Sequence, residues 1–413
     1  MRRVVITGMG VVTALGVGIK ENWDKLISGK SGIKKIDSFK IDDIPSKIAG
    51  VIDEDLLNKF FEEKEKRKMD KFILYSLIAA EEAIKNSGWV ANNDDKSFRT
   101  GVIIGSGIGG LSTIYDNSII LEKDSPRKIS PFFIPSSLIN LASGQVSIKY
   151  NFKGPNHSTV TACASGAHAI GDSFRLIQSD KADVMVAGGA EAAICRLGIA
   201  GFCALRALST KFNNEPEKAS RPFDDARDGF VMGDGAGVLI LEDYEHAKKR
   251  NANIICEIIG YGSSGDAHHV TSPPEDGNGA ERCINSALND AKKNPADIDY
   301  VNAHGTSTPV GDKIEAKCIK KVFLKNLDNL KMSSTKSSIG HLLGASGSVE
   351  SIYSILSIIN KKVPPTLNLE NPIEEIKQID LIPLNSIDHN ANCVLSNSFG
   401  FGGTNASLVF NSI

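Results

Sequence analysis

Short runs of apolar residues alternate along this chain with longer segments whose apolar residues recur at helical spacing. Short apolar runs are typical of buried strands, and a period near 3.6 residues is typical of helices. The alternation indicates an α/β protein built from crossover units. The predicted strands are Arg3–Thr7, Thr100–Gly105, Ser158–Cys163, Ala182–Gly188 and Gly237–Leu241, then Ile254–Ile259, Asp299–Ala303, Leu330–Ser334, Asn392–Ser396 and Ser407–Phe410. The predicted helices include Asp70–Ser87, Gly166–Gln178, Gly279–Lys292 and Ser346–Ile359.

The two series of predicted strands resemble one pattern used twice. They separate near the charged segment Glu242–Asn251, which predicts an N-terminal half over residues 1–250 and a C-terminal half over residues 251–413. In each half, a predicted strand ends at a turn with reactive side chains and continues into a helix. These turns contain Cys163 in the first half and Lys336–His341 in the second. A duplicated α/β unit would bring the two turns together at a pseudo-twofold axis.

The composition is that of an ordinary soluble globular protein, with 413 residues, 41% hydrophobic residues and a net charge of −2. No run of about 18 uncharged apolar residues predicts a membrane span. No signal-peptide pattern precedes the first predicted strand. The seven cysteines lack paired spacings, which favours reduced thiols and a cytoplasmic location. The near-neutral charge argues against general nucleic-acid binding.

Cys163 is the first candidate for chemistry. It lies in the segment Thr159–Ile170, which reads TVTACASGAHAI, at the N-terminal end of a predicted helix. A helix dipole at that position favours the thiolate, the nucleophilic form of cysteine. Small residues on both sides of the sulfur leave room for a bulky substrate. The alternative is a buried structural cysteine, and two distant histidine motifs favour the catalytic interpretation.

These motifs contain His304, in VNAHGTST, and His341, in SSIGHLLGASG. Taken alone, each could equally be a hydrogen-bonded structural histidine. Zinc binding by the two histidines with Cys163 is disfavoured, because the three residues lack ligand-type spacing. A metal site at His268 and His269 is also disfavoured, because adjacent residues rarely share one metal ion.

Two glycine-rich segments have other predicted roles. Gly105–Gly110 matches GxGxxG, but too few residues follow it for the helix and second strand of a dinucleotide site. We therefore expect it to pack closely or to form the wall of a substrate pocket. The loop Asn397–Asn405 could supply a backbone N–H to an oxyanion. Its alternative role is a plain connection between two terminal strands.

Taken together, these segments resemble the β-ketoacyl–acyl carrier protein synthases of the thiolase superfamily over nearly the whole chain. The Cys-His-His set is similar to that of the elongating enzymes, and the segments SGIGG and SPFFIP are closer to synthase II than to synthase I. The resemblance implies a duplicated thiolase-like unit in a five-layer α-β-α-β-α arrangement. The matching motifs are RRVVITGMGVVTALG, SPFFIPSSLIN, KGPN, TACASGAHAIG, RPFDDARDGFVMGDGAG, VNAHGTSTPVGD, STKSSIGHLLGASGSVE and NSFGFGGTN.

The resemblance implies a ping-pong decarboxylative Claisen condensation in fatty acid biosynthesis. Cys163 would attack an acyl thioester, while the backbone N–H groups of Cys163 and Phe401 hold the oxyanion. Malonyl–acyl carrier protein would lose CO2, and His304 and His341 would stabilise the enolate. Lys336 would have an orienting and electrostatic role, paired with Glu350. No cofactor or metal is expected, because the phosphopantetheine arrives on the carrier protein.

The resemblance also implies which residues contact substrates and partners. The expected partners are acyl carrier protein and a second copy of the chain, in a homodimer. Phe401 would be the gate of the acyl pocket. The residues expected at the phosphopantetheine arm are Thr306, Thr308 and Thr271, and those around the acyl pocket are Ile108, Phe202 and Phe133, the last of which could come from the partner. The carrier-docking candidates are Lys64, Arg67, Lys68, Arg127, Lys128 and Arg206, with ordinary solvated charges as the alternative.

Other functions stay open at this point. A synthase I or a polyketide-pathway ketosynthase would use the same chemistry on other substrates. A non-catalytic partner subunit, of the chain-length-factor kind, would lack the nucleophile that Cys163 provides. A hydrolase would release its acyl group to water without condensation.

Overall fold

Eleven strands form one hydrogen-bonded sheet in the computed structural model, which describes residues 1–413. The order is β11-β10-β14-β15-β9-β1-β8-β7-β5-β6, with β2 paired to β1. The strands are β1 (Val4–Thr13), β2 (Gly16–Val17), β5 (Thr100–Gly105), β6 (Asn156–His157), β7 (Val184–Glu191), β8 (Gly235–Asp243), β9 (Cys256–Gly265), β10 (Tyr300–Asn302), β11 (Lys331–Ser333), β14 (Cys393–Gly400) and β15 (Thr404–Asn411). Two small hairpins pair β3 (Ile33–Lys35) with β4 (Ile48–Gly50), and β12 (Lys362–Val363) with β13 (Ile387–Asp388).

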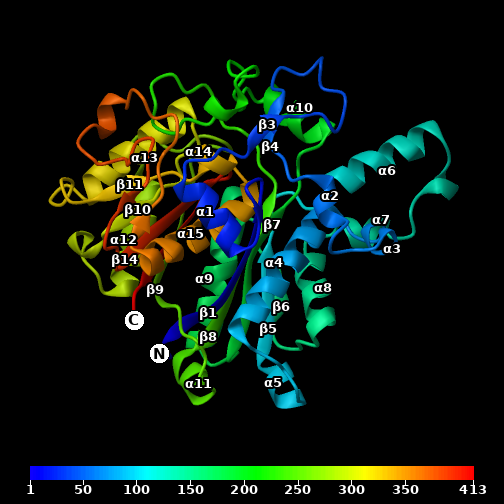
Figure 1. Cartoon of the computed structure of the whole chain (residues 1–413), viewed down its shortest axis with the longest axis horizontal. Helices are drawn as coiled ribbons and strands as arrows, with labels where there is room; N and C mark the ends of the chain where they lie inside the picture. The colour runs from blue at the N-terminus through cyan, green and yellow to red at the C-terminus, as the bar shows by residue number, and fades with distance from the viewer.

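The large sheet divides into two parts that diverge. Strands β1 and β9 pair only between Val4–Ile6 and Cys256–Ile258. Helices α9 (Ser165–Gln178) and α15 (Ser346–Asn360) fill the space between the two parts and contact strands of both. One outer face is covered by α4 (Lys71–Ser87) and α8 (Leu141–Tyr150), and the other by α12 (Asn278–Ala291) and α13 (Pro309–Val322) (Figure 1). The predicted five-layer α-β-α-β-α arrangement is confirmed.

The remaining helices are short or peripheral. None of the helices combines the length and the apolar character that crossing a membrane requires. They are α1 (Ile19–Ile27), α2 (Glu54–Leu57), α3 (Glu63–Lys66), α5 (Asp94–Phe98), α6 (Leu111–Lys123), α7 (Phe133–Ser137), α10 (Arg196–Ala204), α11 (Tyr244–Lys249) and α14 (Lys336–Ile339), with 3₁₀ turns η1 (Pro126–Lys128), η2 (Ala162–Ala164), η3 (Pro216–Lys218), η4 (Pro295–Asp297), η5 (Leu343–Ala345) and η6 (Glu374–Ile376).

The middle layer follows from the composition of its helices. Thirteen of the fifteen residues of α15 are buried, because the helix is apolar or small on every side apart from Glu350. Its serines are compatible with this burial, since Ser351 and Ser357 donate their hydroxyls to the carbonyls of Gly347 and Tyr353, four residues earlier. Helix α9 is more amphipathic, and its buried face includes Ile170 among other apolar residues.

The predicted strands and helices match the observed elements to within a few residues at most ends, with one clear error. Ser158–Cys163 is not a strand: β6 ends at His157, and Ala162–Ala164 forms the 3₁₀ turn η2. The backbone leaves the extended conformation because Ala162 has φ 49°. The Ser165 hydroxyl holds the turn, accepting from the Thr161 N–H and donating to the Ala162 carbonyl. The boundary between residues 250 and 251 stays a prediction.

The two turns that precede the central helices have the same local structure. Turn η2 leads into α9, and turn η5 leads into α15. Ala162 and Leu343 both have positive φ, 49° and 47°, and each turn continues into an Ala-Ser-Gly sequence. Cys163 in the first turn therefore corresponds to Gly344 in the second. This correspondence is the clearest local trace of a repeated unit.

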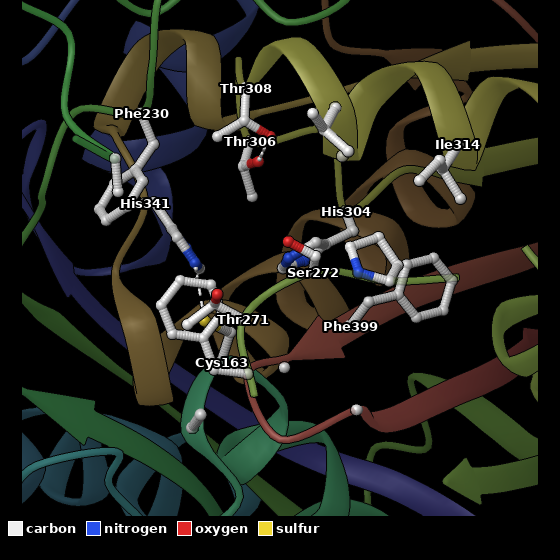
Figure 2. A pocket seen from close by; sticks show the side chains of 18 of the residues that line it. Cys163, Phe230, Thr271, Ser272, His304, Thr306, Thr308, Ile314, His341 and Phe399 are labelled. Carbon is white, nitrogen blue, oxygen red and sulfur yellow. Dashed lines mark hydrogen bonds between the residues drawn. The ribbon is translucent and has the colours of Figure 1, made fainter. Parts of the chain in front are cut away.

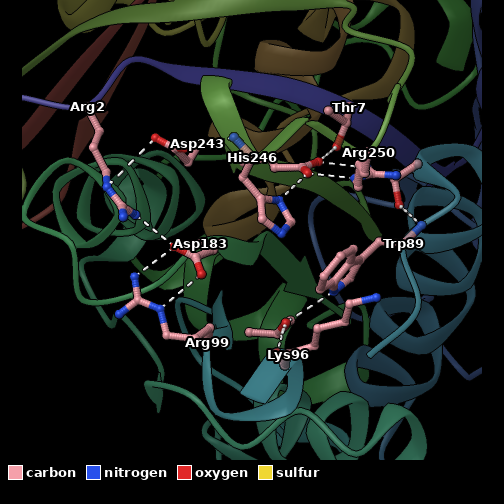
Figure 3. Close-up of polar contacts among 12 residues, drawn as sticks. Arg2, Thr7, Trp89, Lys96, Arg99, Asp183, Asp243, His246 and Arg250 are labelled. Atoms are coloured by element: carbon pink, nitrogen blue, oxygen red, sulfur yellow. Dashed lines mark hydrogen bonds and ion pairs between the residues drawn. The ribbon is translucent and has the colours of Figure 1, made fainter. Parts of the chain in front are cut away.

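A buried polar cluster joins β1, β8 and α11 away from these turns (Figure 3). The wholly buried carboxylate of Glu242 accepts hydrogen bonds from Thr7 and, at two atoms, from Arg250. His246 Nδ1 lies 2.6 Å from the same carboxylate, and the His246 ring meets Trp89 edge-on. Burial alone would raise the pKa of Glu242, but the Arg250 and His246 hydrogen bonds hold it below its ordinary value. The cluster therefore has a structural role, because it links β1 and β8 to α11.

Candidate active site

A cavity of about 570 Å³ lies where the two halves meet (Figure 2). Its wall includes residues from turn η2, from the loop after β10, from the loop between α14 and η5, and from the β14–β15 connection. Ten of the predicted site residues line it together: Ile108, Cys163, Phe202, Arg206, Thr271, His304, Thr306, Thr308, His341 and Phe401. Residues that are far apart in sequence therefore form one site.

Cys163 occupies the centre of turn η2, and its side chain is almost fully buried. Its Sγ lies 3.0 Å from Nε2 of His341. Burial raises the pKa of the thiol to about 12, and the Phe401 N–H and the charge of Lys336 oppose this rise only in part. Burial therefore opposes the thiolate form that the helix dipole favours at this position. The resting pair is a neutral thiol beside an imidazole.

His341 is held from both its backbone and its ring. Its N–H donates to the Val231 carbonyl at 2.7 Å, and its carbonyl accepts from the Gly233 N–H at 2.9 Å. Nδ1 of the ring lies 2.8 Å from the hydroxyl of Ser346, the first residue of α15. Burial, and then the positive charge of Lys336, lower the pKa of His341 well below its ordinary value. The imidazole is neutral near pH 7.

His304 follows β10 and faces His341, with ring centroids 5.3 Å apart and nearly perpendicular planes. The buried carboxylate of Glu315 accepts from the backbone N–H of His304 at 2.8 Å and of Gly305 at 2.7 Å. Burial lowers the pKa of His304 well below its ordinary value, and the charges of Lys336 and His341 add to this effect. Two neutral imidazoles therefore converge near the thiol.

Glu315 is a site residue that the sequence reasoning missed. It lies on α13 among buried neighbours, and burial raises its pKa to about 7. An acidic residue between Ile314 and Ala316, in the buried part of α13, is the signal that could have identified it.

Lys336 and Glu350 form a buried ion pair behind the two histidines. Each side chain is only 1% exposed, and Lys336 Nζ contacts Glu350 Oε1. Burial raises the pKa of Glu350 to about 7, which the adjacent lysine opposes. The structure thus pairs the two residues that the resemblance linked. Because the charge of Lys336 lowers the pKa of both imidazoles, the pair acts on the site electrostatically.

The glycine-rich connection between β14 and β15 approaches the Cys163 thiol through its backbone. The Phe401 N–H makes a hydrogen bond with the Cys163 sulfur, and the Phe401 side chain lines the cavity. Gly402 and Gly403 have φ of 82° and 70°, backbone angles that residues other than glycine rarely adopt. The hydroxyl of Thr404 anchors the connection by donating to the Thr161 carbonyl. This segment is more than a plain connection, because its backbone approaches the sulfur.

Hydroxyl groups and one loop form the outer part of the cavity. The hydroxyl oxygens of Thr306 and Thr308 lie 3.0 Å apart. Thr271 lies on the loop between β9 and α12, where its N–H donates to Nδ1 of His269 at 3.1 Å. These three threonines line the cavity as expected.

The structure does not gather every predicted residue at the cavity. Phe133 begins α7 and does not line the cavity of this single chain. Arg206 lies at the cavity, whereas the other docking candidates lie on or beside α3 and η1: Lys64, Arg67, Lys68, Arg127 and Lys128. Lys128 is paired with Asp124 at 2.7 Å.

Comparisons with known proteins identify this geometry. A family model described as the beta-ketoacyl synthase N-terminal domain matches residues 1–247, and one described as the C-terminal domain matches residues 255–370. The chain is 54% identical to 3-oxoacyl-[acyl-carrier-protein] synthase 2 of Rhizobium meliloti (strain 1021), covering 99% of this chain and 98% of that relative. It is 50% identical to the protein of the same name from Coxiella burnetii (strain RSA 493 / Nine Mile phase I), covering 100% and 99%.

Solved structures agree with these relatives. A beta-ketoacyl synthase from Burkholderia phymatum STM815 has a TM-score of 0.91 at 36% identity, with both chains fully covered. A type II polyketide ketosynthase, solved in complex with its acyl carrier protein and bound to the hexaketide, has a TM-score of 0.92 at 34% identity, again with full coverage. The predicted fold and acyltransferase class are confirmed, and the chain belongs to the β-ketoacyl synthase family.

Proposed function

We propose that this chain is an elongating 3-oxoacyl–acyl carrier protein synthase of type II, acting in fatty acid biosynthesis. The observation that carries the proposal is the 3.0 Å approach of Cys163 Sγ to His341 Nε2 beside a second neutral imidazole, that of His304. The relatives named 3-oxoacyl-[acyl-carrier-protein] synthase 2 support it over a polyketide or synthase I assignment. The presence of the nucleophile argues against a non-catalytic partner subunit.

In the first half-reaction, Cys163 takes an acyl group from its carrier. A bond forms between Sγ and the acyl carbon, and the thioester bond to the carrier breaks. The thiol proton passes by way of His341 Nε2 to the departing carrier thiolate, which suits a cysteine that is protonated at rest. The N–H groups of Cys163 and Phe401 stabilise the developing oxyanion.

In the second half-reaction, malonyl–acyl carrier protein enters and loses CO2. The electron pair of the broken C–C bond forms an enolate, whose oxygen accepts a hydrogen bond from the neutral ring of His304. His341 donates to it as well in the tautomer that carries the ring proton on Nε2, with Nδ1 then accepting from the Ser346 hydroxyl. The enolate carbon attacks the acyl carbonyl, the bond to Sγ breaks, and the released thiolate takes up a proton from solvent. The chain is then two carbons longer, and decarboxylation has supplied the nucleophile without a cofactor or metal.

The proposal includes a homodimer formed along the edge of the sheet. Strand β6 is the last strand of the order, and edge strands expose unpaired backbone groups. Val160, just after β6, and Ile134 and Leu138, on and after α7, are large apolar side chains that a second copy would cover. Phe133 of α7 could then reach the partner's cavity. The proposal also places the protein in the cytoplasm, where its seven free thiols would stay reduced.

The direct test is incubation of the purified protein with acyl–acyl carrier protein and malonyl–acyl carrier protein, followed by intact mass of all proteins. We expect an acyl adduct on Cys163 and a carrier-bound β-ketoacyl product two carbons longer. A series of donor lengths would separate the type II reading from synthase I and polyketide enzymes. Free fatty acid without extension would identify a hydrolase, and no adduct at all would favour a non-catalytic subunit.

Replacement of His304 by alanine should slow malonyl decarboxylation by about 10²- to 10³-fold, because one hydrogen-bond donor to the enolate is lost. Acylation of Cys163 should largely survive, since His341 is the residue that contacts the sulfur. CO2 release and adduct mass measure the two steps separately. His389→Ala, which changes a histidine outside the cavity, is the control. An unchanged rate of CO2 release in His304→Ala would contradict the role given to His304.

Charge reversal at the docking surface should weaken carrier binding. Arg127→Glu with Lys128→Glu should raise KM for carrier-bound substrate at low salt, by roughly fivefold for each ~1 kcal/mol of surface attraction lost. The effect should shrink at high salt, because salt screens exposed charges. Lys292→Glu with Lys325→Glu makes the same change in charge on the C-terminal half and serves as the control. Equal KM values for the two double variants would remove η1 from the docking surface.

A further inference from the structure

The carboxylate of Glu191 lies between the wall of the cavity and the loop that carries His341. Glu191 is the last residue of β7 and is wholly buried. It accepts five hydrogen bonds: from the Ser106 hydroxyl at 2.7 Å and from the backbone N–H groups of Gly107 at 2.7 Å, Ile108 at 3.2 Å, Gly109 at 3.3 Å and Gly344 at 2.9 Å. The carboxylate therefore holds two separate loops at once.

This carboxylate is held by hydrogen-bond donors alone. Two other buried glutamates have cationic partners: Glu350 pairs with Lys336, and Glu242 pairs with Arg250. The contacts of Glu191 are one hydroxyl and four backbone amides, which together make an anion-binding concavity. Burial raises the pKa of Glu191, and these hydrogen bonds oppose that rise. Only the ionised form has an acceptor for every amide that faces it.

The two loops meet backbone to backbone around this carboxylate. A Cβ added to Gly107 would lie 2.8 Å from Glu191 Oε2, and one added to Gly344 would lie equally close to Oε2 and would overlap the backbone nitrogen of Gly107. Neither contact leaves space for a side chain. The glycines thus allow one carboxylate to reach both loops, and the loops cannot shift independently while these bonds persist.

Each loop has a functional end. Ile108 and Leu343, which lie beside these bonds, both line the cavity. His341 lies three residues before Gly344, and the Ser346 hydroxyl that meets its ring lies two residues after it. Glu315 makes an analogous arrangement at the other histidine, since its carboxylate holds the N–H groups of His304 and Gly305.

We propose that Glu191 is a positioning residue that fixes the acyl-pocket wall at Ile108 and the His341 loop as one rigid unit. While these hydrogen bonds hold, the pocket wall at Ile108, which limits the acyl chain, and the imidazole that faces Cys163 keep a fixed position relative to each other. Loss of these hydrogen bonds loosens both the alignment of His341 and the selection of acyl chains. The inference rests on the proposed condensing function, and it adds a residue that contacts neither substrate.

The test compares Glu191→Gln with Glu242→Gln, which removes a charge from an equally buried carboxylate that touches neither loop. In Glu191→Gln the amide NH2 faces backbone N–H groups and cannot accept from them. We expect kcat for condensation to fall by about 100-fold, as for other misplaced catalytic groups, with KM for malonyl carrier nearly unchanged. We also expect the ratio of kcat/KM between hexanoyl and palmitoyl donors to flatten by about tenfold.

A readout without turnover separates this inference from the proposed function. The negative charge of Glu191 contributes to the raised pKa of Cys163. The pH profile of Cys163 alkylation by iodoacetamide should therefore move to lower pH in Glu191→Gln and stay in place in Glu242→Gln. Wild-type protein that shows no condensation would overturn the proposed function, whereas the alkylation shift would still report on Glu191.

Equal falls in kcat for the two variants at equal loss of Tm, with an unchanged donor profile and alkylation profile, would overturn the positioning role. Ser106→Ala covers the case in which Glu191→Gln does not fold. It removes one of the five hydrogen bonds to Glu191, together with the bond from the Gly109 N–H to the Ser106 hydroxyl, and leaves the charge and the amides in place. A change in donor ratio of about fivefold is therefore expected. Wild-type kcat and donor ratio in Ser106→Ala would then overturn the proposal.

Discussion

Replacement of Cys163 by alanine is expected to lower the rate of condensation on the order of 10⁶-fold, the loss seen when a nucleophile is removed from an enzyme that acts through it. The cavity supplies no substitute, because the groups around the sulfur are imidazoles and backbone amides. Intact mass should show no acyl adduct on Cys163→Ala after incubation with acyl–acyl carrier protein. Cys393→Ala, which changes a buried cysteine of β14, should still form the adduct.

The same variant should retain part of its chemistry. His304 and His341 keep their backbone anchors when the sulfur is removed, since Glu315 and Val231 hold them. Malonyl–acyl carrier protein should therefore still lose CO2 on Cys163→Ala, leaving acetyl carrier. An acyl adduct of normal yield on this variant would place the nucleophile elsewhere and refute the mechanism.

Replacement of Lys336 by methionine is expected to give the largest loss of stability. It leaves Glu350 buried without a partner, which costs about 3–5 kcal/mol and lowers Tm on the order of 5 °C. Thermal unfolding by circular dichroism measures this loss. The double variant Lys336→Met with Glu350→Leu removes both charges and should recover most of the lost Tm. A double variant as unstable as the single one would contradict an electrostatic origin.

The pH dependence of both variants tests the effect of Lys336 on the histidines. After burial, the lysine charge is the next cause that lowers the pKa of His304 and His341. Without this charge, both pKa values rise, so the imidazoles become protonated at a higher pH as the solution is acidified. The acidic limb of the decarboxylation profile should therefore move to higher pH in Lys336→Met and in the double variant. Recovery of stability without recovery of the profile would separate the two roles of Lys336.

The local pattern of apolar and polar residues was enough to predict most of the fold, because each element's own residues indicate whether it is buried. The apolar run Thr100–Gly105 is strand β5 with the predicted ends, and the helix predicted at Ser346 begins there. The error at Ser158–Cys163 has a different origin. Its apolar and small residues are typical of a strand. The positive φ of Ala162, however, depends on hydrogen bonds of the Ser165 hydroxyl, which hydrophobic periodicity does not reveal.

The candidate site likewise has residues that the sequence predicted and residues that it did not. Cys163, His304 and His341 lie in segments whose small neighbours and glycines mark them in sequence, and the structure brings them together. The protonated state of the thiol was not predictable, because burial depends on the assembled layers. Glu191 and Glu315 were missed because their partners are mainly backbone amides, which carry no side-chain signature. The acidic residue at the end of the otherwise apolar strand VMVAGGAE was the available hint for Glu191.

The two similar turns are not interchangeable in chemistry. Gly344 occupies the place in the second turn that Cys163 occupies in the first, yet a cysteine would not fit there. Its Cβ would overlap the backbone of Gly107 and press on the Glu191 carboxylate. The space that a second sulfur would need at this position is filled by the neighbouring loop. A single substitution at Gly344 therefore cannot give the second turn the nucleophile of the first.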